Sequence, residues 1–155
     1  MKKFDYIIDK TKGQLVQIYA SIAERNVYIY LGHSQLSPKF VSTIRNALWT
    51  PEGKPRSYKF VMYLACNTAD NRKWMKAFAA KTFIGFKHKV LKCHVIAYDK
   101  VFWREVEKGK SAGVANVFAQ IETVNDEKIR KAYEEEEMPM AIPRIFGNKN
   151  LILKR

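Results

Sequence analysis

The chain contains few residues of the kinds that act as nucleophiles, general bases or metal ligands. Its histidines are His33, His88 and His94, and its cysteines are Cys66 and Cys93. Their spacing matches no metal site, and no histidine has an evident cysteine partner in the sequence. A glycine-rich phosphate loop and a Ser/His/Asp arrangement are also missing. We therefore predict no metal, no cofactor and no catalytic residue, with structural histidines and two buried, reduced thiols.

Positive charge is the strongest chemical signal in the chain. The net charge is +13, and residues 39–92 contain 12 Lys and Arg against two acids. Because Lys and Arg neutralise phosphates and release counterions, a polyanion is the usual partner of such unpaired charge. The alternative is a solvated helix face. The candidate contact residues are Lys54, Arg56, Lys59, Arg72, Lys73, Lys76, Lys87, Lys89, Lys108 and Lys110.

Three tyrosines lie on alternate positions of a predicted hairpin. Tyr19 belongs to its first strand, and Tyr28 and Tyr30 to its second. Aromatic side chains on a sheet next to positive charge are typical of surfaces that stack the bases of single strands. The alternative is that a helix covers this face and the rings belong to the core.

The segment Lys108-Gly109-Lys110-Ser111-Ala112 resembles the Lys-Gly-Lys-Ala-Ala-Leu signature of the Whirly family of single-stranded nucleic-acid-binding proteins. Ser111 replaces an alanine and Gly113 the leucine, and the motif lies later in the chain than in that family. The resemblance implies a strand in a binding sheet, two blocks of strands that each end in a helix, and assembly into tetramers.

A second resemblance would make the protein an enzyme. Ile18-Tyr19 and, after an interval of ten residues, Tyr30-Leu31-Gly32 are similar to the paired tripeptides of the GIY-YIG nucleases. The position expected for the catalytic arginine is occupied by Phe40, and residues 71–86 contain no acid. Without a carboxylate ligand a divalent ion is not held, so the phosphodiester loses its electrophile. This spacing is therefore interpreted as coincidence or as a degenerate relative.

The predicted elements follow from periodicity and from capping residues. Apolar and alternating segments predict strands at residues 4–8, 14–22, 27–32, 58–66, 92–98 and 114–124. Helical spacing predicts helices at residues 38–49, 70–86 and 126–136. Because most intervals are short, we expect an α+β fold with antiparallel sheets and two main helices, in which a strands-then-helix block occurs twice.

The chain is predicted to be one domain, residues 1–137, followed by a C-terminal arm, residues 138–155. The arm contains Pro139 and Pro143 but is too apolar for a free tail, so we expect it to dock on its own domain or on a second subunit. No apolar run reaches the roughly 20 residues that span a bilayer, and the N-terminus lacks a secretory signal. A cytoplasmic protein without a membrane partner is therefore expected.

Together these features predict a non-enzymatic nucleic-acid-binding protein with little sequence specificity. Single-stranded RNA or DNA is favoured over duplex DNA, and self-association through the C-terminal arm is an open expectation. Small basic proteins of this kind are frequent among phage and mobile-element products, which suggests such an origin. Two alternatives remain: a GIY-YIG-like nuclease, and an adaptor whose basic face binds an acidic protein partner.

Overall fold

The computed structural model describes residues 18–19, 27–31, 37–47 and 57–153 of the 155-residue chain. In β1 (Ile18–Tyr19), in β2 (Val27–Leu31) and at residues 40 and 44–47 of α1 (Pro38–Ala47), it describes the backbone alone. Predicted residues Lys54 and Arg56, and the side chains of the three hairpin tyrosines, therefore lie outside what the structure describes.

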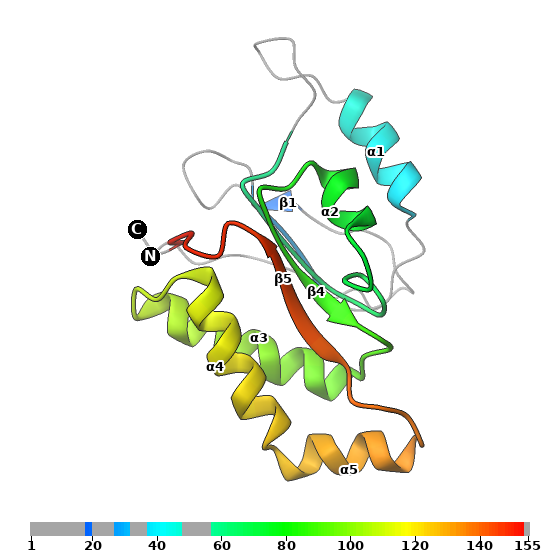
Figure 1. Ribbon diagram of the computed structural model, residues 1–155, viewed down its shortest axis with the longest axis vertical. Helices are drawn as coiled ribbons and strands as arrows, with labels where there is room; N and C mark the ends of the chain where they lie inside the picture. Colours follow the sequence, from blue (N-terminus) through cyan, green and yellow to red (C-terminus); the bar gives the residue numbers. More distant parts are fainter. Residues whose placement is uncertain (1–17, 20–26, 32–36, 48–56, 154–155) are drawn as a thin grey trace.

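The strands form one mixed sheet in the order β1-β2-β3-β4-β5 (Figure 1). β3 (Phe60–Leu64) lies between β2 and β4 (Thr82–Lys87), and these three strands are parallel. β1 at one edge and β5 (Ile142–Gly147) at the other are antiparallel to their neighbours. The prediction of helices combined with a sheet is confirmed. The expected antiparallel sheet is not what forms, because the central strands are parallel.

Helical crossovers explain the parallel centre of the sheet. α1 joins β2 to β3, and α2 (Lys73–Phe78) joins β3 to β4. A parallel neighbour cannot be reached by a tight turn, so the chain must cross one face of the sheet between the two strands. All five residues of β3 are buried, as expected for a strand covered on both faces.

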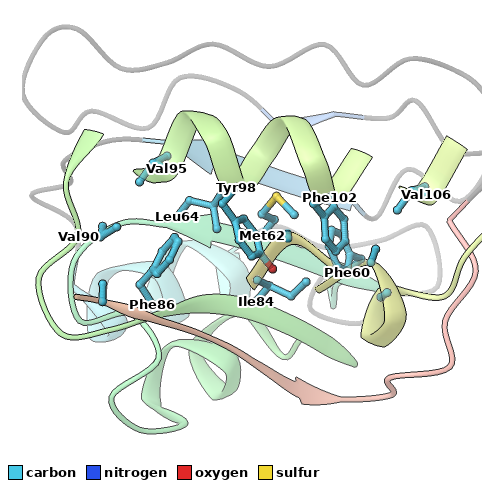
Figure 2. Close-up of a cluster of buried hydrophobic side chains, with 14 of the residues drawn as sticks. Phe60, Met62, Leu64, Ile84, Phe86, Val90, Val95, Tyr98, Phe102 and Val106 are labelled. Carbon is cyan, nitrogen blue, oxygen red and sulfur yellow. The ribbon is translucent and has the colours of Figure 1, made fainter. Parts of the chain in front are cut away.

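The two faces of the sheet have separate hydrophobic cores. On one face, Val41 of α1 and Phe78 of α2 pack with Val61 and Phe83 of the central strands. The other face is covered by α3 (Lys92–Glu107), α4 (Ala112–Val124) and α5 (Glu127–Glu135). Figure 2 shows the second core, in which side chains from β3 and β4 meet those of α3: Phe60, Met62, Leu64, Ile84, Phe86, Val90, Val95, Tyr98, Phe102 and Val106.

Two predicted strands are helices. Residues 92–98 open α3, where the buried Val95, Tyr98, Phe102 and Val106 recur every three or four residues. Residues 114–124 lie in α4, which is capped by Ser111, whose hydroxyl accepts a hydrogen bond from the Val114 N–H. β-Branched residues in short apolar runs suggested strands, but burial of one helical face outweighs that local preference. Five helices are described in place of two main ones.

The helix predicted for residues 70–86 is much shorter. α2 ends at Phe78, because Ala79 takes a left-handed conformation with φ of 50° and its N–H bonds to the Lys76 carbonyl. The chain then forms β4, whose residues from Thr82 to Phe86 are buried. The predicted helix starts at Pro38 and near Asp126 are confirmed, as is a strand within residues 58–66.

The C-terminal segment docks on its own chain. β5 pairs with β4 along its whole length, from Thr82 opposite Gly147 to Lys87 opposite Ile142. Beyond this strand, Leu153 is buried and Ile152 bridges Ser111.

Candidate functional site

Two arginines from distant parts of the chain lie over one aromatic ring. The guanidinium carbon of Arg72, at the start of α2, is 4.7 Å from the centroid of Phe146 in β5. The guanidinium carbon of Arg144, also in β5, is 5.1 Å from the same centroid. We call these three residues the Arg–Phe–Arg cluster. Each contact is within the range of a cation–π interaction, so the ring offsets part of the repulsion between two neighbouring cations.

Local structure fixes both arginines. Arg144 Nη1 donates a hydrogen bond to the carbonyl of Ala69 at 3.3 Å, and Arg72 Nη1 lies 3.8 Å from the Met75 sulfur. Arg144 and Phe146 are two residues apart in a strand, so their side chains project to the same face of the sheet. These contacts hold two fork-shaped donors close together.

Further positive charge surrounds the Arg–Phe–Arg cluster. Lys73 and Lys76 of α2 are exposed, as is Lys81 just before β4. None of these lysines makes an ion pair with another residue that the structure describes, and the same is true of the two arginines. The surface made by Arg72, Lys73, Lys76, Lys81 and Arg144 is here called the α2–β5 basic surface.

The structure separates the other predicted basic residues from this surface. Lys108 and Lys110 lie in the turn between α3 and α4, on the opposite face of the sheet, and Lys108 Nζ is 3.1 Å from a carboxylate oxygen of Glu105. The segment that resembles the Whirly signature thus forms a turn that leads into a helix, not a strand.

The remaining predicted residues are spread over the sheet. Lys59 and Lys87 are half-buried, and Lys89 is exposed beyond β4. The backbone of Tyr28 is in register with Val61, and that of Tyr30 with Tyr63. Arg144 was missed as a site residue because its segment was interpreted as an arm. The spacing Arg144-x-Phe146 would have identified it had the strand been recognised.

A cysteine lies where the parallel strands end. β2, β3 and β4 point the same way, so their carboxyl ends meet at one edge of the sheet, the place where open α/β sheets usually bind ligands. Cys66 follows β3 by two residues and is half-buried, with Sγ 3.4 Å from the Val90 nitrogen. The prediction of two buried thiols in strands is therefore wrong, since Cys93 is exposed on α3.

The turn that carries Cys66 is held rigidly. The buried hydroxyl of Thr68 lies 2.8 Å from the Tyr63 carbonyl oxygen and accepts a hydrogen bond from the Phe86 N–H at 3.2 Å. Asn67, with φ of 61°, donates its N–H to the His88 carbonyl at 3.0 Å. The His88 N–H in turn reaches an Asp70 carboxylate oxygen at 2.9 Å. These bonds fix the end of β3 to the end of β4.

His94 is the centre of a buried hydrogen-bond network. Its Nδ1 is 2.7 Å from the Tyr133 hydroxyl of α5, and its Nε2 is 3.2 Å from the Thr123 hydroxyl of α4. Thr123 donates its hydroxyl proton to the Ala119 carbonyl, so its oxygen acts as the acceptor in the contact with His94. The ring proton of His94 therefore lies on Nε2. Burial lowers the pKa of His94 to about 4. Both ring nitrogens of His94 thus have hydrogen-bond partners, which confirms the prediction of a structural histidine at this position.

The described residues contain no group of three or more His, Cys, Asp and Glu that could hold a metal ion. Within that part of the chain, no helix is long and apolar enough to cross a membrane. Comparison with known proteins assigns no family: no family model matches the chain, and neither a curated protein nor a solved structure matches it.

Proposed function

We propose that the protein binds nucleic acid through the α2–β5 basic surface, with single-stranded RNA or DNA as the favoured ligand. The observation that carries the proposal is the Arg–Phe–Arg cluster, in which one ring holds two guanidinium groups 4.7 and 5.1 Å from its centroid. Arginine forks match phosphate geometry, and two of them in fixed positions offer contacts to one backbone. The exposed Lys73 and Lys76 extend the same surface.

The mechanism is neutralisation of phosphates with release of counterions. Such contacts position a strand and carry no base information, so little sequence specificity is expected. Stacking on Tyr28 and Tyr30 stays a prediction. Changing each to Ala is expected to cost ~1–3 kcal/mol of single-strand affinity without a matching fall in melting temperature.

The test is a binding titration against single-stranded RNA, single-stranded DNA and duplex DNA at low and at physiological salt. The double variant Arg72→Ala, Arg144→Ala is expected to reduce affinity roughly tenfold and to lower the salt slope by about two. Arg72→Lys with Arg144→Lys is the matched variant: it keeps the charge and the slope but loses the fork geometry. Unchanged affinity and slope in the Ala variant would reject the surface. Binding of an acidic protein instead of nucleic acid would favour the adaptor alternative.

A further inference from the structure

α4 has its large apolar residues on the outside. Val114, Val117, Ile121 and Val124 are 41–55% exposed. The residues that face the core are smaller or polar: Ala112, Ala115, Asn116, Ala119 and Thr123. A surface helix normally buries its large apolar stripe and exposes polar residues. α4 shows the reverse arrangement, and a surface of this kind marks an interaction site.

The exposed residues form a regular seam. Their spacing is three, four and three residues, the repeat with which one helix packs along another. Three are valines and one is isoleucine, all β-branched. The seam is also symmetric about Ala119: Val114 and Val124 are equally distant from it, as are Val117 and Ile121. We call these four residues the α4 seam.

The charge around the α4 seam selects its partner. α4 contains no Lys or Arg, and its single acid, Glu122, is engaged by Arg104 of the same chain. Nucleic acid is not attracted to such a surface. Two copies of a chain with net charge +13 repel each other. Contact through α4 brings no lysine or arginine of that helix into the interface, so the local repulsion is smaller there.

We propose that a second copy of this chain packs antiparallel on the α4 seam. A two-fold axis near Ala119 then places Val114 opposite Val124 of the other copy, and Val117 opposite Ile121, so the surface is self-complementary as symmetry requires. Phe118, 42% exposed, lies beside the seam and adds to the contact. A 13-residue helix is about 20 Å long, short for a standard interface of ~800 Å² per partner. The dimer is therefore expected to be weak and to depend on concentration.

Sedimentation velocity or light scattering tests the dimer, on protein freed of nucleic acid and over a range of roughly 5 to 500 µM. The full chain is expected to pass from monomer to dimer within this range. Val117→Glu and Ile121→Lys are each expected to weaken dimerisation at least tenfold. Ile142→Gln, at a residue of β5 that is as exposed as Val114 but outside the α4 seam, is the matched control and is expected to dimerise normally. Ile121→Ala, which favours a helix, replaces any charged variant that fails to fold.

Mixing the two charged variants tests the antiparallel register. In the mixed dimer one Glu faces one Lys and one Val–Ile contact stays intact, so the mixture is expected to dimerise more strongly than either variant alone. A parallel arrangement would pair position 117 with itself and give no such rescue. Monomer throughout the range, dimerisation unaffected by both variants, or an absence of rescue would each overturn the proposal.

Discussion

The two faces of the sheet differ in how they treat charge. Residues 57–91, which include α2, carry seven Lys and Arg against one acid. Residues 92–135, which form the three helices of the other face, carry eight of each sign. Ion pairs follow this balance: Arg104 and Lys108 are bound by Glu105 and Glu122 of the same helical layer. The α2–β5 basic surface thus leaves its cations available to a ligand, whereas the helical layer pairs Arg104 and Lys108 with its own acids.

The same division applies to apolar residues and to polar networks. Among the residues that the structure describes, the helical face contains the larger core, together with the His94 network and the α4 seam. The described part of the α2 face contributes a smaller core and the Arg–Phe–Arg cluster. We infer that the helical face mainly supplies stability and self-association, whereas the α2 face supplies binding. Each of the following experiments can break that division or sharpen it.

Truncation after Glu137 is expected to have the largest effect, because β5 contributes to both faces. Phe146 packs in the core of the α2 face and Ile145 against the core of the helical face. Removing the strand also exposes the edge of β4 along six paired residues. We expect loss of the cooperative thermal transition, followed by circular dichroism, and association detected by light scattering. A truncated protein that melts like the full chain would show that the segment is a dispensable arm.

Acid is expected to weaken the helical face selectively through His94. Its pKa is lowered to about 4 in the folded state against an ordinary value of 6.5, so unfolding binds a proton. The free energy of unfolding therefore contains the full contribution of neutral His94 above about pH 6.5. This contribution, about 3 kcal/mol, is lost progressively as the pH falls towards 4. Urea titrations at several pH values measure this change. His94→Gln is expected to flatten the profile. An unchanged slope in His94→Gln would contradict the assignment.

Much of the fold was accessible from local patterns, and the failures share one cause. Residues 58–66, the start of α1 and the cap of α5 have strong local signals, and these predictions are confirmed. Residues 114–124 combine β-branched side chains with alanines, and only packing of Ala115 and Ala119 against the core decides for a helix. Strand direction is likewise absent from local sequence, because it depends on how each crossover packs.

For the candidate sites, the sequence indicated residue types and the fold decided which of them meet. The Arg72–Arg144 proximity joins positions far apart in the chain, so no local pattern contains it. Lys108 and Lys110 appeared equivalent to Lys73 and Lys76 as charges, yet they lie on the other face of the sheet. A count of charges along the sequence gives the number of cations, but not the face of the sheet on which each one lies.

Gly85→Ala is expected to disturb the α2 face locally, by about 1–3 kcal/mol. A Cβ at this position would overlap the hydroxyl oxygen of Thr68. Thr68 has little room to yield, because it is hydrogen bonded to Tyr63 and to the Phe86 N–H. Denaturant unfolding measures the loss. Because Gly85 pairs with Arg144, a reduced affinity for single strands should accompany it. A fully stable variant would show that the turn after β3 is less rigid than its hydrogen bonds imply.

The smallest expected effect is that of Lys110→Ala, compared with Lys76→Ala. Both lysines are exposed, and each change removes one positive charge, so a ligand attracted only by net charge would respond equally to the two variants. If strands lie on the α2–β5 basic surface, Lys76→Ala is expected to lower affinity a fewfold and the salt slope by about one. Lys110→Ala, on the opposite face, is expected to change the affinity less than about twofold and to leave the salt slope almost unchanged. Salt-dependent titrations of the two variants with the same single strand decide the matter. Equal losses would mean that binding follows the charge of the whole molecule, and the functional division between the faces would then fail.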